Sequence, residues 1–270
     1  MSNVINLKDN DRILISRTDR LGDLVLSLPF IETLKIRYPN CRIDVITSLY
    51  ASPILDNNKR ICKILRVQNN LLLTNNLYKK DLLQKIKKEN YKIVIVLYPE
   101  RKISRLFYQA EIPTRIGTAG RFHSIFYNTH IYHSRKKNIK HEYNYNLDFL
   151  KFFQPGETIE TPSVYIRKKE IIHAQKILKN ACIKKEFIVL HPGTGGSSEC
   201  WPMEHFIKLY KMLEDRGVEL VISGSDKEGE DVEILSKKLG IPVKKITGKT
   251  DLRTLAAVLS LASLVVANST

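Results

Sequence analysis

The amino-acid sequence predicts an α/β protein built on parallel β-sheets. One observation is that apolar runs of strand length, such as residues 12–16 and 92–98, alternate with segments whose apolar residues recur at helical spacing. Another is that these runs are apolar at nearly every position instead of every second one. Continuous apolar strands are typical of a parallel sheet that helices cover on both faces.

The first 160 residues contain alternating strand and helix patterns, followed by a stretch without clear periodicity. The expected strands lie at residues 12–16 (RILIS), 41–47 (CRIDVIT), 64–67 (ILRV) and 92–98 (KIVIVLY), and the expected helices at 24–38, 52–58 and 79–89. Residues 101–146 look like loops rich in Arg, His and Tyr, and residues 154–166 form the expected linker. We therefore expect a first domain over residues 1–160.

A second alternating series follows, and it predicts a second domain over residues 161–270. The expected helices lie at 171–180, 203–216, 230–239 and 252–261, and the expected strands at 186–193, 218–224, 243–247 and 264–268. Two Rossmann-like domains in tandem are the simplest account of both series.

Positive charge is concentrated in the first domain. The chain has 44 Lys and Arg against 28 Asp and Glu, a net charge of +16, and residues 1–160 carry +12 of it. A nucleic acid, an anionic membrane surface, or a phosphorylated or carboxylated acceptor would each suit this charge. The alternative is that the extra lysines cover solvated faces. We expect no nucleic-acid partner, because no nucleic-acid-binding motif is present.

Several absences in the sequence indicate a cytoplasmic protein without metal. No apolar run approaches the ~20 residues of a membrane span, and the first twelve residues lack the apolar stretch of a secretory signal. The four cysteines are scattered, and the histidines lack the spacing of zinc ligands. We expect neither disulfides nor a metal site.

Ligands of open parallel sheets bind at the carboxyl ends of the strands, which makes the loop at residues 17–23 (RTDRLGD) a candidate site. Gly22 permits a tight turn, and Asp23 falls near the first turn of the next helix. Asp23 is either a helix cap or a general base that removes a proton from an acceptor hydroxyl. Asp19 is the competing carboxylate, and Arg17 and Arg20 either bind anions or are solvated.

Three later loops also follow strands. Residues 191–202 (HPGTGGSSECWP) are either a phosphate cradle of glycines and hydroxyls or a flexible surface loop. Around residues 223–231, Ser225 and Glu228 would suit a nucleotide base or ribose, although the acids there would equally suit the start of a helix. Residues 267–270 (ANST) offer polar groups to a phosphate or cap the strand.

These segments together resemble the lipopolysaccharide heptosyltransferases, glycosyltransferase family 9. The resemblance lies in residues 12–39 (RILISRTDRLGDLVLSLPFIETLKIRYP), 188–196 (IVLHPGTGG), 201–213 (WPMEHFIKLYKML), 220–228 (LVISGSDKE) and 261–270 (LASLVVANST). Residues 115–128 and 141–151 are similar to the acceptor-side loops of the family. The similarity covers nearly the whole chain in order.

The resemblance implies a GT-B fold, in which two Rossmann-like domains with parallel sheets face a central cleft. The first domain would bind an anionic acceptor, the lipopolysaccharide inner core on lipid A, and the second a nucleotide sugar, typically ADP-L-glycero-D-manno-heptose. Transfer would be inverting and metal-independent, and would use no cofactor besides the sugar donor. The enzyme would contact the cytoplasmic face of the inner membrane as a peripheral protein, which agrees with the charge of residues 1–160.

The resemblance also assigns roles to single residues. Asp23 would be the catalytic base, and an ordinary Asp, with a pKa of ~3.9, is ionised at neutral pH. The donor would contact Gly193, Thr194, Gly195, Ser225, Glu228, Asn268, Ser269 and Thr270. The acceptor would contact Arg17, Arg20, Arg101, Arg105 and Arg121.

The chain also departs from the family pattern. Glu199 stands where members often carry Lys or Arg, and Asn268 where many carry Asp. The sequence stops at Thr270, ahead of the family's Gly-Pro-x-His segment, so we expect an incomplete second domain. These departures leave open an alternative function, that of a truncated, inactive relative that binds the acceptor or a partner enzyme.

Overall fold

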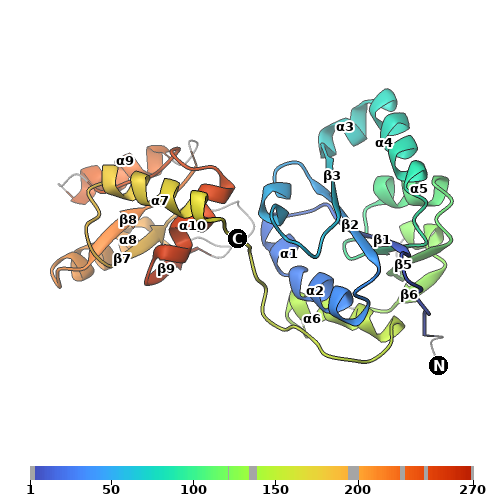
Figure 1. Ribbon diagram of the computed structural model, residues 1–270. Coiled ribbons are helices and arrows are strands. Elements are labelled where there is room, and N and C mark those ends of the chain that lie inside the picture. The colour runs from blue at the N-terminus through green and yellow to red at the C-terminus, as the bar shows by residue number, and fades with distance from the viewer. Residues whose placement is uncertain are drawn as a thin grey trace. The chain divides into compact units, whose positions relative to one another are not determined.

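The computed structural model describes residues 4–120, 122–133, 139–193, 201–225, 229–239 and 243–268. The chain divides into two compact units, Met1–Tyr165 (unit 1) and Ile166–Thr270 (unit 2). Each unit is an α/β structure built on a parallel sheet (Figure 1).

Within the described ranges, unit 1 has a sheet of six parallel strands in the order β3-β2-β1-β4-β5-β6. The strands are β1 (Arg12–Arg17), β2 (Arg42–Ser48), β3 (Lys63–Val67), β4 (Ile93–Val96), β5 (Thr114–Thr118) and β6 (Thr129–Ile131). Strand β1 lies in the interior of the sheet, with Ile15 opposite Val45 of β2 and Ile95 of β4. The loop that follows β1 therefore starts between two neighbouring strands.

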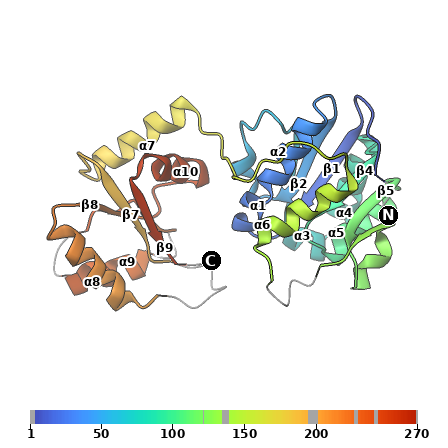
Figure 2. The same cartoon turned by 90° about the horizontal axis from the view of Figure 1, so that it is seen from below.

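Helices cover both faces of this sheet. The elements are α1 (Leu21–Val25), α2 (Leu28–Arg37), α3 (Asn69–Thr74), α4 (Asn76–Lys88), α5 (Arg101–Gln109) and α6 (Glu142–Leu147), with the 3₁₀ segments η1 (Ser52–Leu55), η2 (Phe122–Phe126) and η4 (Asp148–Phe152). Helices α2 and α6 lie on one face, and α3, α4 and α5 on the other (Figures 1 and 2). This arrangement explains why the strands are apolar on both sides.

The structure corrects three sequence-based expectations in unit 1. The helix expected over 24–38 is two helices, and Pro29, which favours a helix start, lies in the first turn of α2. The helix expected over 52–58 is only the 3₁₀ segment η1. Residues 101–146, expected as loops, contain α5, β5, η2, β6 and α6. These elements are short, and the exposed face of α5 is basic. The charged residues of α5 made the helical spacing of its apolar residues hard to recognise in the sequence.

Within the described residues, unit 2 has a sheet of three parallel strands in the order β8-β7-β9. Its elements are α7 (Lys168–Asn180), β7 (Phe187–His191), α8 (Met203–Glu214), β8 (Glu219–Ile222), α9 (Gly229–Leu239), α10 (Leu252–Leu261) and β9 (Leu264–Ala267). One core lies between the sheet and α8 and α9, and another beneath α7 and α10. The strand expected at 243–247 is reduced to a single bridge between Ile222 and Lys245.

Candidate active site at the carboxyl edge of the unit 1 sheet

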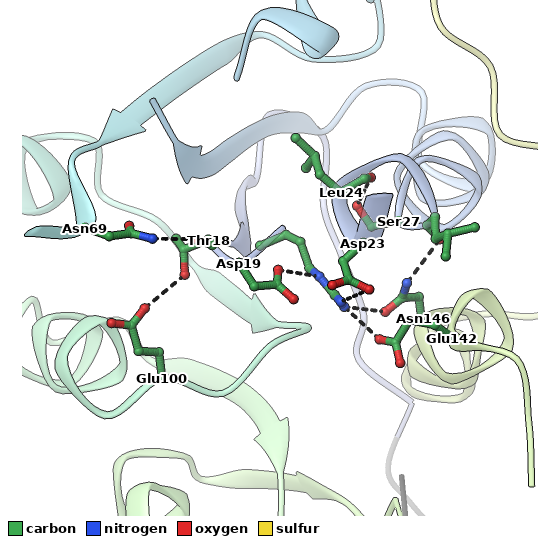
Figure 3. Close-up of polar contacts among 11 residues, drawn as sticks. Thr18, Asp19, Asp23, Leu24, Ser27, Asn69, Glu100, Glu142 and Asn146 are labelled. Atoms are coloured by element: carbon green, nitrogen blue, oxygen red, sulfur yellow. Dashed lines mark hydrogen bonds and ion pairs between the residues drawn. The ribbon is translucent and has the colours of Figure 1, made fainter. Parts of the chain in front are cut away.

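The candidate site begins where β1 ends at Arg17. The side chain of Arg17 is 2% exposed, although a guanidinium is rarely buried without partners. Its Nε lies 2.8 Å from Oδ1 of Asp19, and its Nη2 lies 3.2 Å from Oδ1 of Asp23. Its Nη1 lies 2.9 Å from Oε1 of Glu142 and donates a hydrogen bond of 3.1 Å to Oδ1 of Asn146 (Figure 3). We call this group of five side chains the Arg17 cluster.

The Arg17 cluster joins two parts of the chain that are far apart in sequence. Glu142 and Asn146 come from α6 and lie four residues apart, which places them on one face of that helix. Asn146 also donates a hydrogen bond of 3.0 Å to the carbonyl of Leu26, between α1 and α2. Helix α6 therefore fixes both the guanidinium and the segment that carries Asp23.

Asp23 and Asp19 differ in their access to solvent. Asp23 lies in the first turn of α1, and its side chain is 29% exposed, whereas the side chain of Asp19 is 10% exposed. A general base has to reach the proton that it removes. The exposure therefore favours Asp23 over Asp19 as a group that meets a substrate, while Arg17 fixes the orientation of the Asp23 carboxylate.

Asp19 has an unusual titration behaviour. Burial raises the pKa of its carboxyl to about 6, and the charge of Asp23 acts in the same direction. The guanidinium of Arg17 opposes this rise but does not cancel it. The carboxylates of Asp19, Asp23 and Glu142 share the charge of Arg17, which explains why burial outweighs the attraction.

Other polar contacts fix the loop after β1. The buried Thr18 accepts, through its carbonyl, a hydrogen bond of 2.9 Å from Asn69, at the start of α3. The hydroxyl of Thr18 donates a hydrogen bond of 3.2 Å to Glu100, just before α5 (Figure 3). The starts of α3 and α5 are thus tied to the loop that carries Asp19.

The arginines expected to bind the acceptor fall into different environments. Arg20, Arg101 and Arg105 are exposed, while Arg17 is buried and bound to the chain's own acids. Arg121 lies outside the described residues. Arg17 is therefore bound by carboxylates of the chain itself, including that of Asp23, and is not exposed to an external anion.

Sequence reasoning missed Glu142 and Asn146. Both lie in the segment 141–151, whose spacing of polar residues is compatible with many helices. Their partner Arg17 is more than a hundred residues away, so no local pattern links them. Tyr98 was also missed, and its ring centroid lies 5.8 Å from the guanidinium carbon of Arg17.

In unit 2, Asn268 links the two ends of the segment 191–202, which is rich in glycine. It is 8% exposed, its Nδ2 donates a hydrogen bond of 2.5 Å to the carbonyl of Pro192, and its Oδ1 accepts one of 2.8 Å from the Trp201 amide. This role needs both an acceptor and a donor, which Asn provides and a carboxylate does not. The side chain of Asn268 therefore binds the backbone at Pro192 and at Trp201.

The other expected donor residues are only partly described. Gly193 is buried and Ser225 is exposed, and both follow strands of the unit 2 sheet. His191 and Ser223, at the same strand ends, lie 3.0 Å apart between Nδ1 and Oγ. The remaining positions lie outside the described residues: Thr194, Gly195, Glu199, Glu228, Ser269 and Thr270.

The described residues also bear on metal binding and on membrane insertion. Among them, no group of three or more His, Cys, Asp and Glu side chains is placed to hold a metal ion. None of the helices in the described ranges is long and apolar enough to cross a membrane.

Comparisons with solved structures identify the class of fold. A glycosyl transferase family 9 protein from Veillonella parvula matches with a TM-score of 0.89 at 20% identity, over 98% of this chain and 77% of that chain. The Escherichia coli heptosyltransferase WaaC with ADP-2-deoxy-2-fluoro heptose matches with a TM-score of 0.74 at 20% identity, over 96% of this chain and 83% of that chain. The expected α/β fold of the GT-B type is confirmed.

Sequence comparison identifies the family. Residues 80–270 match the model of glycosyltransferase family 9 (heptosyltransferase), and the chain belongs to this family. Lipooligosaccharide heptosyltransferase 2 of Haemophilus influenzae is 26% identical over 95% of this chain and 77% of its own length. Across its curated relatives, the chain spans between 65% and 77% of their length.

Proposed function

We propose that the protein transfers a heptose from ADP-heptose to the inner core of lipopolysaccharide. The observation that carries this proposal is the partly exposed carboxylate of Asp23, held by the buried Arg17 at the carboxyl edge of a parallel sheet. Family membership supports heptose transfer, and the names of relatives support a lipopolysaccharide or lipooligosaccharide acceptor. A solved structure of similar fold contains ADP, which supports an adenine nucleotide as the donor carrier.

The proposed reaction is an inverting displacement. Asp23 accepts the proton of an acceptor hydroxyl, whose oxygen forms a bond to the anomeric carbon of the heptose. The bond between that carbon and the diphosphate oxygen breaks, and ADP leaves from the opposite face. Arg17 keeps one oxygen of Asp23 occupied, so that the other remains available for the proton. No metal ion takes part in this scheme.

The donor and acceptor would contact different units. The strand ends of unit 2, at Gly193 and Ser225, would bind the nucleotide sugar, with Asn268 holding the loop. The exposed Arg20, Arg101 and Arg105 of unit 1 would bind the anionic acceptor. Because that acceptor is anchored in a bilayer, the protein would work as a peripheral protein at the cytoplasmic face of the inner membrane.

The test is a transfer assay with the 270-residue chain, ADP-heptose and heptose-deficient lipopolysaccharide, in which ADP release is measured. We expect Asp23→Asn to lower turnover by about 10²–10⁴-fold, because general-base catalysis contributes this much, while ADP affinity measured by calorimetry stays the same. Asp56→Asn, at a surface ion pair with Arg66, is the matched control. EDTA should leave the rate unchanged.

Each other outcome has a definite meaning. Unchanged turnover in Asp23→Asn would remove Asp23 from the role of base. A wild-type chain that binds the acceptor but transfers no sugar would support the inactive relative instead.

A further inference from the structure

The helices α3, α4 and α5 form an outer layer over one face of the unit 1 sheet (Figures 1 and 2), and α5 also contacts η2. Their inward side chains belong to one buried core, which contains Leu72, Leu82, Ile86, Ile103, Leu106, Phe107 and Tyr127. The remaining side chains of this layer therefore face outward. We call the outer side of α3, α4 and α5 the α3–α5 surface.

Two leucines are exposed on the α3–α5 surface. Leu73 in α3 is 53% exposed, and Leu77 in the first turn of α4 is 79% exposed. The turn between the two helices is well defined, because Oδ1 of Asn75 accepts a hydrogen bond of 2.9 Å from the Tyr78 amide. The sequence thus presents these leucines on an ordered, capped turn.

The helices of the α3–α5 surface are also rich in cations. Helices α4 and α5 carry eight Lys and Arg against a single acid, Asp81, which pairs with Lys85 at 2.7 Å. A groove of about 380 Å³ runs between the helices, and its apolar floor contains Leu72, Leu83 and Leu106. The cations that line it are Lys79, Lys80, Lys102 and Arg105.

The groove cations are not used within the protein. Lys80, Lys102 and Arg105 make no ion pair with any residue that the structure describes, and no carboxylate in those ranges lines the groove. Lys79 donates only to Oδ1 of Asn76, at 3.0 Å. Mutual repulsion of unpaired cations over an apolar floor is unfavourable unless an anionic partner meets them.

We propose that the α3–α5 surface docks on an anionic lipid bilayer. Leu73 and Leu77 enter the boundary between headgroups and acyl chains, and the groove cations meet lipid phosphates. The combination of exposed leucines with cations favours a bilayer over a nucleic acid, whose phosphates would meet the cations but leave the leucines exposed to water. The surface is ordered in advance, so docking requires no folding of the segment.

The docking surface rests on the proposed function, because a membrane-anchored acceptor gives the protein a reason to bind a bilayer. The hydrogen bond that Asn69 donates to the Thr18 carbonyl ties the start of α3 to the loop after β1, and the one that the Thr18 hydroxyl donates to Glu100 ties the start of α5 to it. Docking through the α3–α5 surface would therefore hold the edge of the sheet that carries Asp23 near the membrane. A membrane-anchored acceptor would then meet the candidate base without leaving the bilayer.

The experiment is co-sedimentation of the full chain with vesicles, in the absence of any sugar donor or acceptor. Vesicles of phosphatidylcholine with about 30% phosphatidylglycerol are compared with phosphatidylcholine alone, at low and high salt. One variant is Lys79→Ala/Lys80→Ala/Lys102→Ala, and another is Leu73→Ser/Leu77→Ser. The matched controls in unit 2 are Lys168→Ala/Lys169→Ala/Lys176→Ala, which removes three exposed cations of α7, and Ile172→Ser/Met212→Ser, at residues 45% and 48% exposed.

We expect the wild type to bind only the anionic vesicles. Each basic residue near an anionic surface contributes roughly fivefold in affinity, so the triple variant should lose about 100-fold. The leucine variant should lose about tenfold in affinity. Part of wild-type binding should persist at high salt, because the contact of Leu73 and Leu77 with the acyl chains does not depend on charge. Both unit 2 controls should bind within about twofold of the wild type.

Several results would overturn the proposal. Equal losses in the unit 2 controls would mean that net charge alone attracts the chain, and an unaffected leucine variant would mean that nothing enters the bilayer. Tighter binding to double-stranded DNA than to vesicles would assign the surface to a nucleic acid. ADP calorimetry and transfer to a deacylated acceptor need no vesicle, so failure of the proposed function is distinguishable from failure of the docking surface.

Discussion

Asp19→Asn is expected to stabilise the protein, although it removes a buried ion pair. The pKa of the Asp19 carboxyl is raised from 3.8 to about 6, chiefly by burial and further by the charge of Asp23, against the attraction of Arg17. The folded state therefore binds the Asp19 proton more tightly than the unfolded state. The free energy of unfolding falls as the pH rises from about 4 to about 6, because ionisation of Asp19 disfavours the folded state.

The size of the effect follows from the shift in pKa. A shift of about two units at ~1.4 kcal/mol per unit corresponds to about 3 kcal/mol once Asp19 is fully ionised. An asparagine keeps an oxygen beside Arg17 Nε and never becomes charged. Arg17 also retains Asp23 and Glu142, so it is not left buried without a partner. The expected gain is about 3 kcal/mol at pH 8 and under about 1 kcal/mol at pH 4.

Urea unfolding followed by far-UV circular dichroism at several pH values measures this difference. Asp56→Asn is the control, because its carboxylate is 40% exposed and forms a surface ion pair with Arg66. Such pairs contribute between ~0 and ~1 kcal/mol, so we expect a small effect that does not grow between pH 4 and pH 8. A loss of more than about 1 kcal/mol in Asp19→Asn at pH 8 would refute the reasoning, since the ion pair with Arg17 would then outweigh the cost of burial.

Three further substitutions test, in turn, core packing, backbone strain and an ion pair. Gly117→Ala in β5 should destabilise unit 1 by about 1–3 kcal/mol in urea unfolding, because a Cβ there would overlap the buried ring of Tyr127. Substitution at Gly217 by Ala, where no atom lies within 4 Å of an added Cβ but φ is +72°, tests backbone strain without overlap and should cost less, about 1 kcal/mol. Glu170→Gln should destabilise the protein at pH 7 but not near pH 2. The contact with Arg253 lowers the pKa of Glu170 to about 2, so its stabilisation is complete above about pH 4.5 and is lost as the pH falls through 2.

The sequence predicted the parts of the fold in which burial is continuous. Strands β1 and β4 are covered on both faces, so residues 13–15 and 93–96 are apolar at every position and the pattern is visible without an alignment. The region of α5 to α6 was not predicted, although Ile103, Leu106 and Phe107 have helical spacing and are buried. Arg101, Lys102 and Arg105 lie beside or between them and gave the segment the composition of a loop.

In the candidate site too, the features that depend on neighbouring residues could be predicted, and those that depend on residues distant in sequence could not. The turn with Gly22 and the position of Asp23 after β1 follow from neighbouring residues, and so could be predicted as a place for chemistry. The burial of Arg17 could not, because it depends on Glu142 and Asn146 in α6. An arginine before two aspartates is as compatible with a solvated loop as with a buried guanidinium.

The distribution of cations in unit 1 then has a physical explanation that its net charge alone does not provide. Arg17 is inside, where its charge is shared by the carboxylates of Asp19, Asp23 and Glu142, and it adds little to the field that an external anion meets. Lys80, Lys102 and Arg105 are outside, without partners among the described residues, and their charge is available to an anion. Loss of the inner cation therefore acts on folding and on the orientation of Asp23, whereas loss of the outer cations acts on affinity for anionic partners. The two groups are separable by experiment because they do not share a carboxylate.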